Sequence, residues 1–342
     1  MKKALVIRFS SLGDITLTLP AVASLVEQGY EVSFLTKRSF APLVEMSSNV
    51  HRIYTIEDHA SIFELISILK EIRTDGIDRV FDLHRNLRSL LCIAFLRKPF
   101  VRISKHRFKE WLLYVFRKRV FRALGFKRLS RMKDSLHLVS ECAFSRFETV
   151  ETLSKLSSVP SLLFKKDEFV AICVESKWKQ KEWNFDRFLT VAEGLKLPIV
   201  WLGIHALNRR ENDLEQDLTG KLNLKEVASV LSQAKILICN DSGLMHIAES
   251  VGTPVLAIFG PTSKELGFGP RLAQSRIVEN EGLWCRPCSK TGRACFRISN
   301  RQKCLKTVTV DQVLTAAKSM TENLEIRAKS VNVSESFAER ST

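Results

Sequence analysis

Short apolar runs alternate with segments of helical periodicity along this chain, and this alternation constrains its fold strongly. In the first half the runs predict strands at 4–9, 31–35, 50–56 and 79–83, and the periodic segments predict helices at 21–28, 62–72 and 87–96. Strands joined through helices pair in parallel, because each helix carries the chain back to the end of the sheet at which the previous strand began. The pattern therefore predicts a mostly parallel sheet covered by helices.

The same alternation starts again after Ser157-Ser-Val-Pro160. Strands are predicted at 169–174, 198–202, 235–239 and 254–259, and helices at 185–195, 223–234 and 310–324. A chain of 342 residues also exceeds one comfortable hydrophobic core. We therefore expect an α/β protein with two doubly wound, Rossmann-like domains facing across a central cleft. The expected domains are residues 1–160 and 161–328, followed by a disordered, serine-rich tail at 329–342.

One predicted strand-to-helix turn has the composition of an anion site. After the run at 235–239 the sequence reads Asn-Asp-Ser-Gly-Leu-Met-His-Ile-Ala over 240–248, and the apolar residues that follow the glycine fall on one helix face. A helix that begins here leaves its first backbone N–H groups unpaired. These groups, the positive helix end and the small Gly243 suit an anion. The turn therefore predicts a phosphate-bearing ligand.

A second turn of this kind follows the first predicted strand. It reads Arg-Phe-Ser-Ser-Leu-Gly-Asp over 8–14 and lies at the carboxyl end of the strand, where open α/β sheets bind ligands. Ser10, Ser11 and Gly13 are also ordinary turn residues, and Asp14 is also a common helix cap. Two such turns on facing domains would border one cleft, in which the carboxylate of Asp14 suits a general base.

The net charge of +16 is concentrated in one basic segment, residues 97–133, which holds fourteen Lys or Arg and one acid. Four apolar residues fall at helical spacing among these cations: Phe108, Trp111, Leu112 and Val115. This pattern is typical of an amphipathic helix at an anionic membrane surface. A helix packed on its own domain, with a solvated basic face, is the alternative. We disfavour a nucleic-acid partner because no nucleic-acid-binding signature accompanies the charge.

Neither a membrane-spanning segment nor a signal peptide is expected. No uncharged apolar run approaches the roughly 20 residues that cross a bilayer. Arg8 and Asp14 interrupt the segment that follows Lys2 and Lys3, which a signal peptide would not tolerate. We therefore expect a cytoplasmic protein that docks peripherally on a membrane surface.

Four of the eight cysteines lie close together in a stretch rich in Lys and Arg, as Cys285-x2-Cys288-x6-Cys295-x8-Cys304. In the cytoplasm such residues are thiols or metal ligands rather than disulfides. The first pair has the spacing of zinc ligands and the second pair does not. A structural zinc is therefore one interpretation, and free thiols are the favoured one. Neither is required for the chemistry that the other motifs indicate.

Four motifs together resemble those of glycosyltransferase family 9, the ADP-heptose:lipopolysaccharide heptosyltransferases. They are RFSSLGD at 8–14, KEW at 181–183, NDSGLMHIAESVGTP at 240–254 and FGPT at 259–262. The resemblance implies a GT-B fold whose carboxyl-terminal domain holds the sugar nucleotide. The implied reaction transfers heptose from ADP-heptose to the inner core of lipopolysaccharide, with inversion and without a catalytic metal. It would take place at the cytoplasmic face of the inner membrane.

The resemblance also implies catalytic roles for two residues. Asp14 matches the family's proposed base, which deprotonates the acceptor hydroxyl, and Ser10, Ser11 and Gly13 would shape the loop around it on the acceptor side. Lys181 matches the cation that offsets the leaving diphosphate, the task that a divalent ion performs in other transferases. From the residues alone, a solvated surface lysine is the alternative.

On the donor side, the resemblance assigns Asp241 to the heptose hydroxyls. Ser242, Gly243 and Leu244 would present backbone N–H groups to the phosphates. His246 either donates a hydrogen bond to a phosphate or lies buried under the turn as a satisfied histidine. The residues do not decide between these two interpretations.

The segment Asp-Leu-His-Arg-Asn-Leu-Arg-Ser over 82–89 resembles the family's acceptor-side turn, in which Arg88 can pair with a sugar-acid carboxylate. It departs from the family pattern at His84 and Arg85, where smaller or amide residues are common, so the acceptor stays open. Solvated cations in a first helical turn are the alternative for Arg85 and Arg88. Cations are disfavoured at that end of a helix, which favours a bound anion.

Two other functions remain open from the sequence. One is another GT-B glycosyltransferase that uses a different nucleotide sugar. The other is a non-catalytic protein that binds an anionic glycolipid through the basic segment. A dehydrogenase is disfavoured because no Gly-x-Gly-x-x-Gly follows the first predicted strand.

Overall fold

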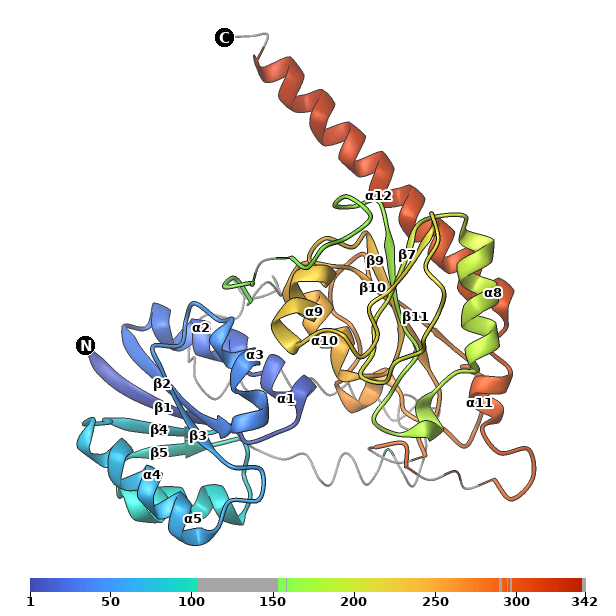
Figure 1. Ribbon diagram of the computed structural model, residues 1–342. Coiled ribbons are helices and arrows are strands. Elements are labelled where there is room, and N and C mark those ends of the chain that lie inside the picture. Colours follow the sequence, from blue (N-terminus) through green and yellow to red (C-terminus); the bar gives the residue numbers. More distant parts are fainter. Residues whose placement is uncertain are drawn as a thin grey trace.

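Two parallel β-sheets with helices packed against them make up the computed structural model of the protein (Figure 1). The structure describes residues 1–103, 113, 153–157, 159–288, 291–293, 295 and 297–339, with side chains in the last helix described through 326. Most of the basic segment 97–133 lies outside the described residues. Its amphipathic helix therefore stays a prediction.

The first sheet has five parallel strands in the order β3-β2-β1-β4-β5. Its strands are β1 (Lys2–Ile7), β2 (Tyr30–Lys37), β3 (Arg52–Ile56), β4 (Arg79–Asp82) and β5 (Phe100–Arg102). The helices of this part are α1 (Leu12–Thr16), α2 (Leu19–Glu27), α3 (Ala41–Glu45), α4 (Ile62–Thr74) and α5 (Leu87–Leu96). The middle strand β1 is buried from Ala4 to Ile7, because it has a strand on each side and helices above and below.

The second sheet has six parallel strands in the order β11-β10-β9-β6-β7-β8. Its strands are β6 (Val170–Cys173), β7 (Ile199–Trp201), β8 (Glu215–Asp217), β9 (Ile236–Asn240), β10 (Val255–Phe259) and β11 (Arg276–Glu279). The helices are α8 (Phe185–Leu195), α9 (Leu224–Leu231), α10 (Gly243–Ser250), α11 (Lys303–Lys306) and α12 (Val310–Glu339). All residues of β9 and β10 are buried, as expected for inner strands of a parallel sheet.

Three apolar layers hold these elements together. One lies between the first sheet and the helices α4 and α5. Another lies between the second sheet and the helices α8 and α12. The third contains core residues of both domains, because α1, α2 and α3 lie on the side that faces α9 and α10 (Figure 1). The two domains therefore share one continuous apolar layer.

Contacts between helices join the two domains directly. Helix α1 packs against α10 and α3 packs against α9, where Lys225 Nζ lies 2.5 Å from the carboxylate of Glu45. The described part of the linker touches both domains as well. The backbone N–H of Leu153 donates to the carbonyl of Ser250 at 3.1 Å, and that of Ser154 donates to the carbonyl of Met46 at 3.0 Å.

The structure confirms the α/β class and the two parallel sheets that the alternation predicts. The pattern does not predict β5, β8, β11, α1, α3 or α11, each of which has three to five residues. Elements this short show no period, so their apolar residues cannot be distinguished from those of a loop. The domain boundaries at 160 and 328 stay a prediction.

The last helix differs from expectation. Helix α12 runs from Val310 to Glu339 and extends away from the second domain (Figure 1). Residues 329–339, which we expected in a disordered tail, continue this helix, because no glycine or proline after residue 310 ends it. Despite its length, neither α12 nor any other described helix is apolar enough over a sufficient stretch to cross a membrane.

Candidate active site

The first β–α turn carries Asp14 on the short helix α1, three residues after the N-cap Ser11. The hydroxyl of Ser11 donates to Asp14 Oδ2 at 2.8 Å, and Arg8 Nη2 lies 2.6 Å from Asp14 Oδ1. Arg8 also donates to the carbonyl oxygens of Ser10 and Leu83, which fixes its guanidinium at the end of β1. The Asp14 side chain remains 23% exposed, so its carboxylate is oriented and still accessible.

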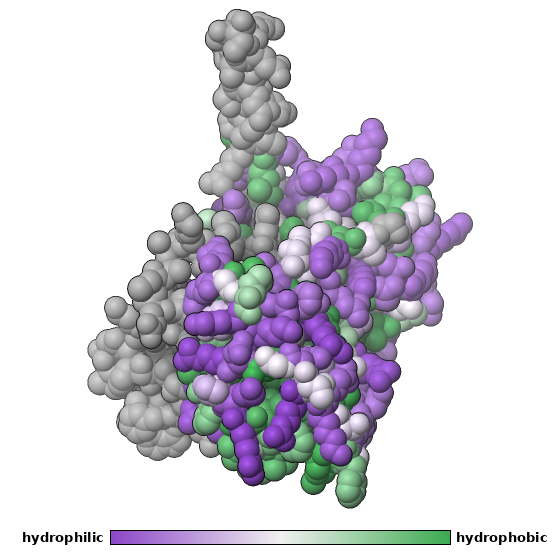
Figure 2. Space-filling model, turned by 90° about the vertical axis from the view of Figure 1, so that its left-hand side faces the viewer, coloured by the Kyte–Doolittle hydropathy of each residue, from purple (hydrophilic) through white to green (hydrophobic). Residues whose placement is uncertain are grey.

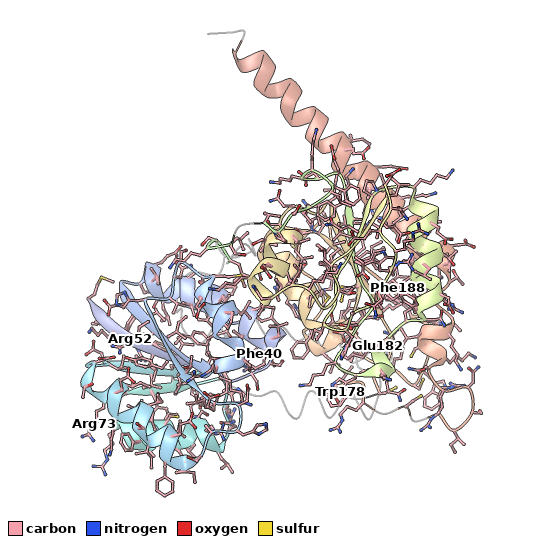
Figure 3. All side chains as sticks on the ribbon, in the orientation of Figure 1. Phe40, Arg52, Arg73, Trp178, Glu182 and Phe188 are labelled. Carbon is pink, nitrogen blue, oxygen red and sulfur yellow. The ribbon has the colours of Figure 1, made fainter. Side chains whose placement is uncertain are left out.

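The second turn starts from Asn240, a buried residue at the end of β9. Its side-chain amide donates to the carbonyl of Val174 at 2.7 Å and accepts from the backbone N–H of Trp183 at 2.9 Å. These bonds tie the segment 174–183, which carries Lys181, to the end of the strand. In Figure 3, Trp178 and Glu182 of this segment lie at the lower end of the second domain, and Phe40 lies on the side of the first domain that faces it.

Lys181 and Asp241 form a largely buried ion pair. Lys181 Nζ lies 2.6 Å from Asp241 Oδ2, and the two side chains are 13% and 8% exposed. The hydroxyl of Thr262 donates to the same carboxylate oxygen, and Ser176 Oγ donates to the Asp241 carbonyl at 3.1 Å. The pair is thus held from several segments, and the alternative of a solvated surface lysine is wrong.

Helix α10 begins directly after this aspartate, with Ser242 as its N-cap. Within the part of the chain that the structure describes, the Ser242 side chain forms no capping hydrogen bond. The backbone N–H groups of Gly243 and Leu244 belong to the first turn, where no carbonyl of the helix can accept from them. This end of α10 therefore offers donors to an anion beside the Lys181 ammonium.

The two turns contact each other directly. A Cβ atom placed on Gly13 would lie 2.5 Å from Cδ2 of His246, and one on Gly243 would lie 2.7 Å from Cδ2 of Leu12. The two glycines thus permit a close approach of α1 and α10 that a side chain would obstruct. Residues 8–14 of the first domain and 240–246 of the second therefore meet at one junction, as the sequence predicts.

His246 lies in this junction and is buried. Burial, reinforced by the positive charge of Arg271, lowers the pKa of His246 to about 3, while Asp241 and Asp14 act in the opposite direction. The imidazole is therefore neutral near pH 7. Among the described residues its Nδ1 has no hydrogen-bond partner. His246 is thus buried under the turn, as one interpretation held, but it is not satisfied there.

Asp82, which is fully buried, organises the acceptor-side turn after β4. Its Oδ1 accepts from the backbone N–H groups of His84 at 3.0 Å and Arg85 at 2.8 Å. Its Oδ2 accepts from Ser89 Oγ and from Arg102 Nε, each at 2.8 Å. The protein's own groups therefore build this turn without a ligand.

Arg88 lies in the first turn of α5 and is partly buried. Its Nη2 donates to the carbonyl of Ala60 at 3.1 Å, just before α4. The exposed Arg85 likewise donates from Nη1 to the carbonyl of Ile103 at 3.1 Å. Arg88 is thus not a freely solvated cation. A guanidinium has five N–H groups in a fork, so an anchored Arg88 can still pair with an anion.

Comparison with known proteins identifies the family. Residues 65–296 match the model of glycosyltransferase family 9 (heptosyltransferase). The chain belongs to this family. Family 9 membership makes the protein a glycosyltransferase, and the matched region includes Arg88, Lys181 and the whole turn at Asp241.

Several heptosyltransferases are similar to this family 9 chain in sequence or fold. Lipopolysaccharide heptosyltransferase 1 from Pseudomonas aeruginosa is 23% identical over 314 residues, which cover 84% of this chain and 86% of that protein. Lipooligosaccharide heptosyltransferase 2 from Haemophilus influenzae is 38% identical over 80 residues, a stretch that covers 22% of each chain. The structure of Escherichia coli ADP-heptose lps heptosyltransferase II has a TM-score of 0.67 and 19% identity, and the match covers 95% of this chain and 100% of that one. The structural likeness confirms the GT-B fold.

The four cysteines of residues 285–304 form no disulfide with any described cysteine of this glycosyltransferase. Cys285, Cys288 and Cys304 are buried, and burial raises the pKa of Cys304. Over the described ranges, which include Cys295 as well, no group of three or more His, Cys, Asp or Glu side chains is arranged to hold a metal ion. The geometry therefore gives the zinc interpretation no support.

Three contributors to the family 9 site were not singled out from the sequence. Arg8 and Thr262 stand inside the quoted motifs RFSSLGD and FGPT, so their positions at strand ends were a usable signal. Gly292 gave no such signal. A Cβ atom on it would lie 3.1 Å from Cγ of Lys181, a contact between segments far apart in the sequence.

Proposed function

We propose that this family 9 enzyme transfers heptose from ADP-heptose to a sugar of the lipopolysaccharide inner core, in one inverting displacement without a catalytic metal. The proposal depends on the direct contact between two β–α turns, one with Asp14 and one with the Lys181–Asp241 pair beside a helix N-terminus. A base that activates a hydroxyl and a cationic site that stabilises a departing diphosphate are what such a transfer needs. The similarity to heptosyltransferases supports heptose as the transferred sugar.

Asp14 takes the proton of the acceptor hydroxyl while the hydroxyl oxygen attacks the anomeric carbon. The bond from that carbon to the diphosphate oxygen breaks on the opposite face, so the configuration inverts. The proton ends on the Asp14 carboxylate, and the electron pair leaves on ADP. Ser11 and Arg8 orient this carboxylate, and its partial exposure lets it reach the acceptor.

The donor diphosphate binds at the start of α10. The backbone N–H groups of Ser242, Gly243 and Leu244 donate to phosphate oxygens, and Lys181 offsets the charge that develops on the leaving group. Lys181 and Thr262 hold the Asp241 carboxylate in place, and it accepts hydrogen bonds from the heptose hydroxyls.

His246 has a more limited part in donor binding. Its neutral imidazole carries one N–H group, which can donate to a phosphate oxygen of the donor. The ring lies against Gly13 of the acceptor-side loop, so it also borders the place where the two substrates meet.

The acceptor binds on the first domain. Ser10, Ser11 and Gly13 shape the loop beside the base, and Arg88 pairs with an acidic group of the acceptor sugar. The basic segment 97–133 holds the enzyme at the cytoplasmic face of the inner membrane, where such a glycolipid is accessible.

A thermal-shift series with ADP-heptose and with UDP, GDP and CMP sugars, followed by transfer to an inner-core acceptor, tests this function. We expect ADP-heptose to stabilise the protein most, by about 2.7 kcal/mol at a hundredfold excess over its Kd. We expect transfer to persist in a metal chelator, with an inverted anomeric configuration by NMR. Stronger stabilisation by a UDP sugar would show that the donor is that sugar nucleotide and not ADP-heptose. Glycolipid binding without nucleotide binding or transfer would instead support a non-catalytic protein.

A further inference from the structure

Helix α5 has an exposed apolar face. Its other face packs in the core, but Leu87 is 81% exposed, and Leu90 and Leu91 are exposed as well. These residues are spaced by three and four positions, so they lie together on the helix surface. A helix that is hydrophobic all round is normally buried on all sides. The outer face of α5 is therefore an apolar surface that no described residue of this domain buries.

Helix α4 extends the same surface. Phe63, in its first turn, is 85% exposed, and its neighbour Ile62 is also exposed. Arg88 Nη2 donates to the Ala60 carbonyl, which holds the first turns of α4 and α5 side by side. The α4–α5 patch comprises Ile62, Phe63, Leu87, Leu90 and Leu91. Figure 2 shows apolar surface at the lower end of the first domain, where Figure 1 places α4 and α5.

The charges around the patch favour an anionic partner. Between residues 83 and 103 the chain has no acid and five cations. Arg85 and Arg88 lie beside Leu87, Arg97 and Lys98 follow the carboxyl end of α5, and Arg102 is paired with the buried Asp82 at 2.8 Å. The acids before α4 are already paired, Glu57 with Arg38 at 2.6 Å and Asp58 with Lys37 at 3.5 Å. The one acid in the first turn of α4, Glu64, accepts from the backbone N–H of Glu57 at 2.8 Å. An apolar surface with Arg85 and Arg88 beside it, on a chain of net charge +16, fits an anionic bilayer better than a second copy of this basic chain.

The patch also lies at the reactive edge of the first sheet. Helices α4 and α5 follow β3 and β4, so they begin at the carboxyl ends of parallel strands. Strand β4 pairs with β1, whose carboxyl end leads into the turn that carries Asp14. The first turns of both helices therefore border the same edge of the sheet as the proposed base.

We propose that the α4–α5 patch inserts into the headgroup boundary of an anionic bilayer and holds the reactive edge of the first domain against the membrane. The claim that this membrane carries the acceptor rests on the proposed function. The docking itself does not depend on it. Exposed apolar side chains with cations around them are the combination by which peripheral proteins bind anionic bilayers. The five patch residues precede the basic segment, so the patch is a membrane contact separate from the predicted helix at 108–115.

Vesicle flotation of the intact protein tests the docking. The vesicles are phosphatidylcholine alone or phosphatidylcholine with anionic phosphatidylglycerol, and the variant is Phe63→Ser/Leu87→Ser. Each apolar side chain that leaves the bilayer should weaken partition by about tenfold, so we expect about a hundredfold loss on anionic vesicles. The matched control is Leu163→Ser/Leu214→Ser, which removes two exposed leucines outside the patch and should bind like wild type.

Three outcomes would overturn this proposal. The first is equal partition of Phe63→Ser/Leu87→Ser and wild type. The second is a variant that no longer self-associates in sedimentation equilibrium but still binds vesicles, which would show that the patch binds a second copy of the protein. The third is a lowered unfolding temperature of the variant without a change in partition, which would show that other residues of this chain pack on the patch.

An activity measurement separates the docking from the proposed function. With a delipidated, soluble acceptor the patch variant should transfer heptose at the wild-type rate, and with the acceptor in vesicles it should be slower. If wild type transfers heptose to neither acceptor, the proposed function fails, and the flotation result still decides the docking. If both acceptors are used equally well by wild type and variant, the docking proposal fails while the function stands.

Discussion

The two aspartates at the domain junction have similar partners but differ in exposure and in how firmly their side chains are held. Each lies 2.6 Å from a cation, Asp14 from Arg8 and Asp241 from Lys181. Asp14 is partly exposed, and its partners Arg8 and Ser11 lie within six residues of it. Asp241 is nearly buried, and its side chain is held from two other segments of the second domain. Similar charge pairs therefore give an accessible carboxylate in the first domain and a fixed one in the second.

This difference suits two different tasks. A base has to reach the acceptor and carry a proton away, so it needs access and only local support. A cation that stabilises a leaving diphosphate acts most strongly where water is scarce and its position is fixed in advance. The first turn thus fits proton transfer, and the second fits the binding of charge.

Replacing the accessible carboxylate should have the largest effect. We expect Asp14→Ala to lower kcat by about 10²–10⁴-fold, because no other group in the turn can take the proton. Donor affinity should stay nearly unchanged, since the donor residues lie in the second domain. Transfer rates and calorimetric titration with ADP measure the two effects.

Ser11→Ala is the matched control for this variant. It removes the N-cap hydroxyl that donates to Asp14 at 2.8 Å but leaves the carboxylate in place. Since Arg8 still holds the carboxylate at 2.6 Å in this variant, turnover should fall much less in Ser11→Ala than in Asp14→Ala. Wild-type turnover in Asp14→Ala would remove this residue from the role of base.

Removing the cation of the Lys181–Asp241 pair should lower both activity and stability. Lys181→Met leaves the carboxylate of Asp241 nearly buried without its cation. We expect kcat to fall by about 10²–10³-fold and the free energy of unfolding to fall by about 3 kcal/mol. Kinetics and urea denaturation measure the two losses. Lys179→Met, on an exposed lysine of the same short helix, is the control and should change neither.

A double variant separates the two roles of this pair. Lys181→Met/Asp241→Asn removes the uncompensated charge, so it should recover stability without recovering the rate. If the double variant regained the rate as well, the pair would be structural, and the contrast between the two turns would fail.

Both turns were predictable because each consists of a strand, a turn and a helix that are contiguous in the sequence. Asp14 and Asp241 stand where an apolar run ends, and a parallel sheet places such positions at its ligand-binding edge. The pattern could not reveal which residues of the two turns touch. The contacts of Gly13 with His246 and of Gly243 with Leu12 join opposite domains, and only tertiary packing sets them.

Other features escaped prediction for different physical reasons. The exposed face of α5 reads as core in the sequence, because leucines on both sides of a helix give no sign of which side is covered. The continuation of α12 past residue 329 differs from the expected disordered tail, because a serine-rich composition does not end a helix where glycine and proline are absent. Only the first of these depends on neighbours that the sequence does not show.

The contact between the turns can be broken from either side, with unequal results. A Cβ on Gly13 meets a ring atom of the buried His246 at 2.5 Å, whereas one on Gly243 meets the flexible end of Leu12 at 2.7 Å. A displacement of about 1 Å can cost about 10²-fold in rate. We expect Gly13→Ala to lower kcat by about 10–100-fold and Gly243→Ala to lower it less. Steady-state kinetics ranks them, and a larger loss in Gly243→Ala would reverse the comparison.

Removing the ring should relieve the clash. In Gly13→Ala/His246→Ala the added methyl group has space, so part of the lost rate should return. Small-angle scattering should show a larger radius of gyration for Gly13→Ala than for the double variant, because the obstructed turns separate. His246→Ala alone is the reference, because it measures the loss of the imidazole itself. If the double variant were slower than His246→Ala by the same factor that separates Gly13→Ala from wild type, the rate loss would not come from this contact.

The smallest effect concerns stability and pH. Burial lowers the pKa of His246 from 6.5 to about 3. Below about pH 6.5 this histidine is therefore protonated in the unfolded chain but stays neutral in the folded protein. The stability that depends on a neutral His246 is thus complete above pH 6.5 and is lost as the pH falls toward 3. We expect the difference in unfolding free energy between wild type and His246→Asn to change by about 1 kcal/mol per pH unit between pH 6 and pH 4. Urea denaturation across this range measures it, with His51→Asn on an exposed histidine as the control. Parallel curves for wild type and His246→Asn would show that the folded protein binds this proton as readily as the unfolded chain does, so burial would not keep the imidazole neutral.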